Sequence, residues 1–337
     1  MGSLGRGGGV EASTAAASPA APLPGALGLL VSTPRTLALP DSARRVTIKT
    51  SRGAFAALEA LPATGVCERS PALLVPGFTG SKEDFLSVIG LLAAAGRRVV
   101  AIDMRGQYET AASQDAAAYS LAALAADVAL IADEVAAQDG SPGNGRPQVH
   151  LMGHSFGGLV AREVMLARAA PVASLTLMSS GPGALTGPRA ADLRQVLAAL
   201  EAVPETELAG LVKHIWEVEL EPGAVADGTA PDVVEFLRTR MLGNCPLGLR
   251  VMAKTLLTCP DRTKGLRQAA AGPLLVVYGE DDDAWAPAMQ EAMAERLKAQ
   301  RVCIPAAMHS PAVEAPETTA STLTKFWNAA ETNPPNR

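Results

Sequence analysis

A serine between two glycines is the strongest candidate for nucleophilic chemistry in this sequence. Residues 153–157 are Gly-His-Ser-Phe-Gly, with Ser155 at the centre. In such a G-x-S-x-G motif a strand turns sharply into a helix, and the turn lifts the serine hydroxyl clear of the backbone. The motif alone is weak, since the glycine and serine content of the chain supplies a chance match with odds on the order of one in ten. Its meaning therefore depends on the partners that a serine nucleophile needs.

A serine hydroxyl needs a general base at neutral pH, and the four histidines of the chain are the candidates. His150 falls within a predicted buried strand, and His214 falls in a helical segment. His154 precedes the serine inside the turn, so its side chain is expected to point away from the hydroxyl. His309 follows the last predicted strand, on a loop before a helix. Because strand ends in an open α/β sheet meet in one crevice, His309 is the predicted base; a surface histidine is the alternative.

The acid that orients this base is expected after another strand, between the serine and the histidine in chain order. Residues 279–283 supply a glycine turn followed by one Glu and three Asp residues. Asp282 is the predicted acid, Asp283 is the second choice and Asp281 the third. A metal site is the competing interpretation, because hard cations favour carboxylate oxygens, but the run lacks the alternating spacing of a calcium loop. No metal and no cofactor are therefore predicted.

The oxyanion formed by attack on a carbonyl needs backbone N–H groups that already point toward it. Phe156, the residue after the serine, is expected to supply one. Phe78, in the loop after a predicted strand, is expected to supply the second, because Gly77 and Gly80 would let that loop approach closely. A plain strand-to-helix turn is the alternative interpretation of this loop.

Apolar runs that alternate with helical patterns predict the elements that must position these residues. The first two strands, at residues 45–49 and 54–61, form a predicted hairpin. The other predicted strands cover residues 71–75, 98–102, 149–152, 173–178, 274–278 and 301–304. Such alternation favours an α/β fold with a mostly parallel, doubly wound eight-stranded sheet that helices cover on both faces.

The pattern changes between two of these strands, where only helices are predicted. Residues 184–266 carry helical segments near 190–202, 205–217, 231–241 and 247–257, and they are predicted to form an inserted module. The core would then comprise residues 29–183 and 267–330. Residues 1–28 are rich in Gly, Ala, Ser and Pro and are expected to form a flexible tail, because they cannot bury enough apolar surface.

Composition excludes several classes of partner. The chain has 337 residues, 48% of them hydrophobic and 19% charged, with a formal net charge of -5 and no basic cluster, so nucleic acid is not expected as a partner. The four cysteines form no metal-binding or disulfide pattern. No apolar run approaches the roughly 20 residues that cross a bilayer, so no membrane partner is expected. The sequence predicts a cytoplasmic protein with a small-molecule substrate, and it allows a homo-oligomer.

The chain resembles the α/β-hydrolase superfamily, in particular its capped, single-domain esterase and peroxidase-like members. The resemblance rests on the order of Ser155, an aspartate after a later strand, and His309. It also rests on residues 103–107, which are similar to the family's Asp-x-Arg-Gly-x loop, and on residues 309–316, which are similar to its histidine motif. It covers roughly residue 46 to the last helix. The chain departs from the family where Pro76 replaces a common histidine and where the acid loop has one extra residue before its proline.

The resemblance implies a serine hydrolase that cleaves a carboxylic ester, a lactone or a thioester through an acyl-enzyme. It implies that the inserted helices form a cap over the strand ends. Candidate walls of the substrate pocket are Trp285, Trp216, Met252, Met241 and Leu242, although core packing is the more frequent role of such residues. Relatives that use an aspartate nucleophile, the haloalkane dehalogenases and epoxide hydrolases, are excluded by Ser155.

Two other functions remain as alternatives. Carbon–carbon bond hydrolases of ring-cleavage products also use serine, but they typically place an aromatic residue after the histidine, where this chain has Ser310. A non-catalytic small-molecule receptor is the alternative outside the enzymes, and such proteins often lack a member of the Ser-His-Asp set. Acyl transfer and perhydrolysis would use the same residues as hydrolysis, so the sequence leaves the acyl acceptor open.

Overall fold

An eight-stranded sheet forms the centre of the molecule. The computed structural model describes residues 1–2, 31–63, 65, 67, 69–138 and 147–332. The strand order is β1-β2-β4-β3-β5-β6-β7-β8. The strands are β1 (Ala43–Thr50), β2 (Gly53–Ala60), β3 (Arg69–Val75), β4 (Arg97–Ile102), β5 (Val149–His154), β6 (Val172–Met178), β7 (Leu274–Gly279) and β8 (Gln300–Ile304). β2 pairs antiparallel with β1 and β4, and the remaining pairs are parallel. The predicted fold class is confirmed.

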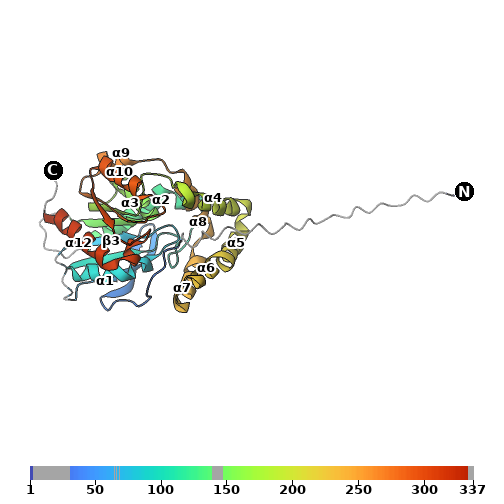
Figure 1. The fold of residues 1–337 in the computed structure, drawn as a ribbon, viewed down its shortest axis with the longest axis horizontal. Helices are drawn as coiled ribbons and strands as arrows, with labels where there is room; N and C mark the ends of the chain where they lie inside the picture. The colour runs from blue at the N-terminus through green and yellow to red at the C-terminus, as the bar shows by residue number, and fades with distance from the viewer. Residues whose placement is uncertain (3–30, 64, 66, 68, 139–146, 333–337) are drawn as a thin grey trace.

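Helices cover both faces of the sheet (Figure 1). One face carries α1 (Leu86–Ala94) and α12 (Pro316–Thr332), and the other carries α2 (Leu121–Ala137), α3 (Phe156–Ala167) and α10 (Pro287–Leu297). Each face has its own hydrophobic cluster. All residues of β4, β5 and β7 are buried, as expected for parallel strands covered on both sides.

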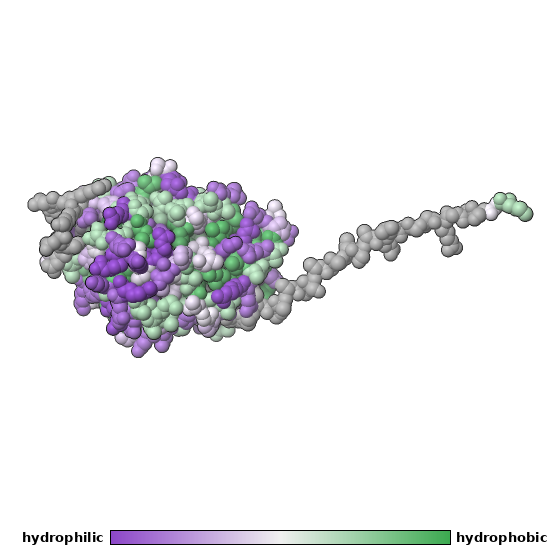
Figure 2. Space-filling view, turned by 90° about the horizontal axis from the view of Figure 1, so that it is seen from above, coloured by the Kyte–Doolittle hydropathy of each residue, from purple (hydrophilic) through white to green (hydrophobic). Residues whose placement is uncertain are grey.

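The connection between β6 and β7 is helical, and its helices from α4 to α8 lie at one end of the sheet, on the right in Figure 1. We call its helices from α4 to α8 the cap: α4 (Gly187–Ala202), α5 (Leu208–Ile215), a π-helical turn at Trp216–Leu220, α6 (Glu221–Ala226), α7 (Pro231–Gly243) and α8 (Pro246–Thr258). The next helix, α9 (Thr263–Ala269), packs against α3 and α10 of the core. The cap helices therefore finish with α8, a few residues before the predicted boundary at 266. Hydrophobic residues gather toward this end of the molecule in Figure 2.

A buried ion pair joins the cap to the core. Arg240 on α7 places Nη1 2.6 Å from Oδ1 of Asp84, and both side chains are almost fully buried. Burial, partly offset by Arg240, raises the pKa of Asp84 to about 6. Nη2 of Arg240 also donates to the backbone oxygen of Ser32, so the segment that begins at Val31 lies between the cap and the core.

Some predicted boundaries differ from the structure. The helix predicted from Lys82 begins with a 3-10 turn, and the short helices α6 and α11 (Pro311–Glu314) were not predicted. The predicted N-terminal tail, residues 1–28, falls on residues outside those described, apart from the first two. Within the described part of the chain, no helix is long and apolar enough to cross a membrane.

Candidate active site

The turn between β5 and α3 presents Ser155 at the carboxyl edge of the sheet. Ser155 has φ 54° and ψ -120°, a conformation that is rare for a residue with a side chain and is typical of strained functional turns. The flanking glycines permit it: a Cβ on Gly153 would overlap the backbone of Gly157, and a Cβ on Gly157 would overlap the backbone of Pro76. The local steric requirement therefore explains why the motif has glycine at both positions.

His309 links the serine to an acid. Its Nε2 lies 2.9 Å from Oγ of Ser155, and its Nδ1 lies 2.9 Å from Oδ1 of Asp282. The loop that carries the histidine is held by Glu314, whose Oε2 accepts hydrogen bonds from the backbone N–H groups of Met308, at 2.6 Å, and Ser310, at 3.3 Å. The imidazole thus has one nitrogen facing an acid and the other facing a hydroxyl.

Asp282 makes the contact with His309, whereas Asp283 and Asp281 do not. Oδ1 of Asp282 also accepts from the backbone N–H of Ala284, and Oδ2 accepts from Nε2 of Gln290 at 2.7 Å. Burial alone would raise the pKa of this carboxyl group, but the attraction of His309 and these hydrogen bonds outweigh burial and lower it. Asp282 is therefore held as the carboxylate that can accept the Nδ1–H hydrogen bond.

The ligand-type atoms of Asp282, Asp283 and His309 lie within 4.8 Å of one another, which is close enough to consider a metal. The contacts of these atoms do not fit one. Both oxygens of Asp282 already accept hydrogen bonds, and Asp283 is paired with the guanidinium of Arg189 at 2.7 Å. A cation placed among them would face this guanidinium, so the set fits proton transfer better than metal binding.

The loop after β3 approaches the serine closely. A Cβ added to Gly77 would lie 3.3 Å from Cβ of Ser155, and Phe78 follows it in the wall of the same hollow. The loop is held by Gln107, whose Nε2 donates to the backbone oxygens of Gly77, at 2.7 Å, and Phe78, at 3.2 Å. Phe156 is the first residue of α3, where a backbone N–H has no acceptor within the helix. The structure therefore brings the two predicted donor residues to the serine.

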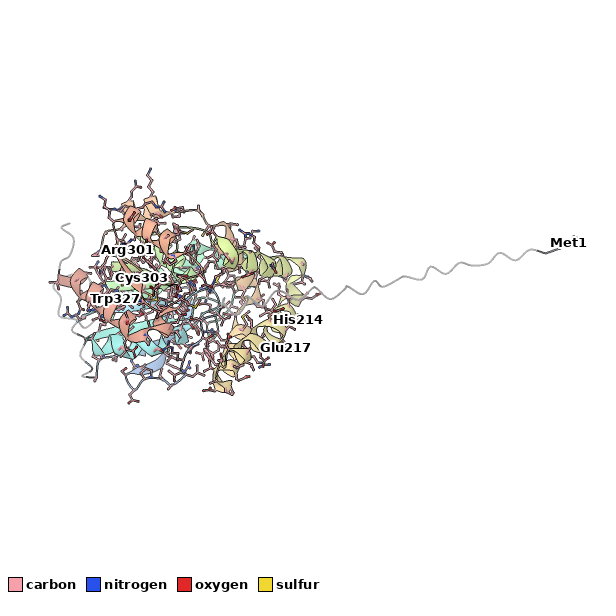
Figure 3. All side chains as sticks on the ribbon, in the orientation of Figure 1. Met1, His214, Glu217, Arg301, Cys303 and Trp327 are labelled. Carbon is pink, nitrogen blue, oxygen red and sulfur yellow. The ribbon has the colours of Figure 1, made fainter. Side chains whose placement is uncertain are left out.

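The other histidines have different surroundings. His154 was expected to point away from the hydroxyl, but it lines the hollow beside Ser155, and its Nε2 lies 2.7 Å from the backbone oxygen of His309. Burial and the neighbouring His309 lower the pKa of His154 to about 3, so its ring is neutral and can donate this hydrogen bond. His150 is buried in β5 and stacks on Trp327, and His214 lies on the cap (Figure 3).

Two hollows adjoin at the site. The first is lined by Ser155, His309, His154, Arg189 and Asp84, together with parts of the loop after β3. The second lies under the cap, and its walls are almost entirely apolar: Val31, Phe78, Thr79, Val196, Leu200, Val212, Ile215, Leu220, Met241 and Leu249. Val31, Phe78 and Thr79 line both hollows. The apolar hollow therefore borders the hollow that contains Ser155.

Of the five residues predicted as pocket walls, Met241 lines the apolar hollow, whereas Trp285, Met252 and Trp216 are packed in the interior. Trp285 is fully buried, and its Nε1 donates to the backbone oxygen of Gly183 at 3.1 Å. Met252 and Trp216 are buried in the main hydrophobic cluster, and Trp216 lines a small hollow that shares Val31 and Leu220 with the apolar one. None of the three is among the described residues that line the two hollows at the serine. Large side chains in a cap help to hold its helices together, and only the docked helices decide which smaller residues face the ligand.

Several positioning residues were not predicted. Gln290 supports Asp282, Gln107 holds the loop after β3, and Arg189 enters the hollow from α4. Gln107 had a signal in the sequence, since it ends the Asp-x-Arg-Gly-x loop. For Gln290 and Arg189 no motif was available, because each acts through a contact that only the tertiary fold creates.

Comparisons with known proteins bear on the family and the fold of the chain. A family model described as the alpha/beta hydrolase family matches residues 72–322. The chain is 38% identical over 116 residues to a putative carbamate hydrolase, RutD, of Variovorax paradoxus, a match that covers 34% of this chain and 40% of that protein. It is 26% identical over 253 residues to a putative 2-succinyl-6-hydroxy-2,4-cyclohexadiene-1-carboxylate synthase of Bacillus subtilis, covering 74% of this chain and 87% of that protein.

A solved structure has the same fold. The esterase from Thermogutta terrifontis superposes with a TM-score of 0.62 at 24% sequence identity, and the match covers 85% of this chain and 99% of that one. At this identity the likeness supports the fold rather than a shared substrate.

Proposed function

The chain belongs to the alpha/beta hydrolase family and is a hydrolase; on that premise we propose that it cleaves a carboxylic ester, or a related acyl bond such as a lactone or thioester, of a small molecule through Ser155. The observation that carries the proposal is the continuous contact from Asp282 through His309 to Ser155, with 2.9 Å at each step. A serine, a histidine and a carboxylate in this geometry form the arrangement that activates a hydroxyl for acyl transfer.

In the proposed first step, Ser155 Oγ attacks the carbonyl carbon while His309 Nε2 takes its proton. Asp282 accepts the Nδ1–H hydrogen bond, fixes the tautomer that leaves the Nε2 lone pair toward the serine, and stabilises the imidazolium that forms. The backbone N–H groups of Phe78 and Phe156 stabilise the oxyanion. His309 then gives the proton to the leaving alcohol, and the acyl group remains on Ser155.

In the second step, water enters the hollow and His309 removes its proton as the oxygen attacks the acyl-enzyme. The tetrahedral intermediate uses the same two N–H groups, and its collapse returns the proton to Ser155 and releases the acid. The neutral state of His154 helps here, because a second cation beside His309 would oppose the formation of the imidazolium.

The apolar hollow under the cap supports an acyl group with a hydrocarbon part. Its walls come from the cap helices and from Val31, Phe78 and Thr79, which also border the serine. The similar protein of Variovorax paradoxus is a putative carbamate hydrolase, so carbamates belong among the substrates to be assayed beside esters, lactones and thioesters.

A panel of p-nitrophenyl esters from acetyl to decanoyl, assayed with the wild type and the Ser155→Ala variant, tests the proposal. Loss of a serine nucleophile is expected to lower kcat about 10⁴-fold or more on every substrate that the wild type cleaves. Circular dichroism of the variant controls for folding. Equal activity of the folded variant and the wild type would refute the assignment of Ser155 as the nucleophile.

A further inference from the structure

Arg189 is a buried cation at the candidate active site for which the proposed reaction has no use. It lies on the first turn of α4 and lines the hollow that contains Ser155 and His309. Only 7% of its surface is exposed. A buried guanidinium is costly unless its N–H groups find acceptors, so its contacts decide what it can do.

The contacts of Arg189 with the protein leave part of its hydrogen-bonding capacity unused. Its single ion pair among the described residues joins Nη2 to Oδ1 of Asp283 at 2.7 Å. Its buried Nε has no hydrogen-bond partner in the part of the chain that the structure describes, and Oδ1 of Asp283 makes no aligned hydrogen bond there either. Asp283 is also partly exposed, at 27% of its side chain. A guanidinium has five donors, so Arg189 can bind a second anion beside Asp283.

The start of α4 adds to this positive character. Leu185, two residues before the helix, lines the same hollow, so the N-terminal end of this 16-residue helix lies at the site. Its N-cap residue, Thr186, makes no side-chain capping bond. Free N–H groups at a helix N-terminus attract anions, and Gly187 and Arg189 can supply them here, whereas Pro188 has none.

The position of Arg189 indicates which end of a substrate it would meet. Asp283, its partner, is adjacent to Asp282, which contacts His309. The apolar hollow instead adjoins the site at Phe78 and Thr79, on the loop after β3. An acyl chain in the apolar hollow would leave the alcohol part in the hollow that contains both Arg189 and His309, which protonates the leaving alcohol.

We propose that Arg189 and the N-terminus of α4 bind a carboxylate on the alcohol part of the substrate, so that the natural substrate class is an ester between an apolar acyl chain and a hydroxy acid. This inference rests on the proposed function of the same site. A carboxylate is the anion that fits, because its two oxygens match the fork of the guanidinium. The chemistry of hydrolysis is unchanged: water enters, the ester C–O bond breaks, and the products are the fatty acid and the hydroxy acid.

Two esters of equal size test the proposal with the full chain. Butyryloxyacetate carries a carboxylate on its alcohol part, and butyryloxyacetamide carries a neutral amide in the same place. We expect the ratio of their kcat/KM values, carboxylate over amide, to fall roughly 30-fold in Arg189→Gln, the loss typical of one charge-assisted pair. Arg194→Gln, which removes an exposed charge from the same helix, is the matched control and is expected to keep the wild-type ratio.

Asp283→Asn separates anion binding from a structural role. If Arg189 and Asp283 merely clamp the cap to the acid loop, both substitutions lower activity on the two esters in parallel. If Arg189 binds substrate, Asp283→Asn removes a competing carboxylate and raises the ratio about three-fold or more. A parallel loss in both variants, or an unchanged ratio in Arg189→Gln, overturns the proposal.

Binding to an inactive protein distinguishes this inference from the proposed function. Calorimetry with Ser155→Ala is expected to show butyryloxyacetate binding, and the Ser155→Ala, Arg189→Gln double variant is expected to bind it at least about 10-fold more weakly. If binding depends on Arg189 but the wild type cleaves no ester, the carboxylate site is supported and the assignment of Ser155 as the nucleophile of a hydrolase is refuted. Equal binding by the two variants would refute the carboxylate site, whatever the wild type cleaves.

Discussion

The side chains around His309 differ in how much their removal is expected to lower the rate of the reaction. Asp282 holds the ring through a 2.9 Å hydrogen bond and is itself held by Ala284 and Gln290. Asp281, in the same loop, is exposed. A buried carboxylate that fixes a tautomer is worth far more to the reaction than a neighbouring charge on the surface.

Asp282→Asn is predicted to lower kcat about 10⁴-fold, because an amide can force the imidazole into the wrong tautomer while the geometry stays intact. Asp281→Asn, with the same change of charge at an exposed position, is predicted to keep kcat within about three-fold of the wild type. The measurement is kcat on the best p-nitrophenyl ester. A loss confined to the Asp281 variant would show that the acid has been assigned to the wrong aspartate.

The sequence could predict only those site residues that have a local sequence signal. Ser155 has a steric signature in its own glycines, and His309 follows from chain order and the last strand. The choice between Asp282 and Asp283 needed the path of the loop, which turns one toward His309 and the other toward Arg189. The orientation of His154 was predicted incorrectly, since the ring lies in the wall of the hollow.

At the scale of elements, α12 is tied to the sheet by a cluster of charged and polar side chains around Glu331. Glu331 lies 3.0 Å from Arg97 on β4, 3.1 Å from Arg69 on β3 and 3.0 Å from His150 on β5. Burial alone would raise the pKa of Glu331, but these three partners lower it to about 2. The helix is thereby joined to three neighbouring strands.

Glu331→Gln is predicted to lower the free energy of unfolding by about 2 kcal/mol at pH 7, because it leaves the buried Arg97 without its counter-charge. A carboxyl whose pKa is lowered on folding stabilises the fold above its unfolded pKa, and this stabilisation is lost as the pH falls. The stabilisation is lost between pH 4.5, the ordinary pKa of a glutamate, and about pH 2, the pKa of Glu331 in the folded protein. The difference between wild type and variant should therefore shrink from pH 7 to pH 3.

Urea unfolding at the two pH values measures this difference, and Glu317→Gln, at the exposed start of the same helix, is the control. A difference of the same size at pH 7 and pH 3 would contradict the role given to the charge of Glu331.

The strands were easier to predict than the cap helices. A parallel strand buried on both faces must be apolar throughout, so runs such as β7 stand out in the sequence. The helix predicted over 205–217 is instead divided into a 3-10 turn, α5 and a π-helical turn, because packing of the cap sets where each segment bends. Propensity and periodicity carry no information on that docking.

At the scale of the whole molecule, the cap and the core together form the apolar hollow beside the serine. The apolar hollow exists only because cap helices meet Phe78 and Thr79 of the core beside Val31. Residue type predicted correctly that Trp216, Met252 and Trp285 would be buried, but it could not predict which side chains line the two hollows at the serine.

Leu249→Phe is predicted to shift the preferred acyl chain toward shorter esters. Leu249 is a buried wall of the apolar hollow, so a larger ring there excludes part of the chain. Burial of each methylene group contributes about 0.8 kcal/mol to binding. Exclusion of two methylene groups from the hollow is therefore expected to lower kcat/KM for the octanoyl ester about 10-fold relative to the acetyl ester. Val225→Phe, on an exposed position of α6, is the matched control. An unchanged octanoyl-to-acetyl ratio in Leu249→Phe would mean that the acyl chain lies elsewhere.

The most direct test of the central claim is to identify the atom that becomes covalently modified. A fluorophosphonate probe reacts with a serine only when a base has activated it. Peptide mass spectrometry of the labelled protein is predicted to find the adduct on Ser155, with labelling strongly slowed in His309→Gln and absent in Ser155→Ala. An adduct on another residue, or equally fast labelling of the His309 variant, would contradict the account.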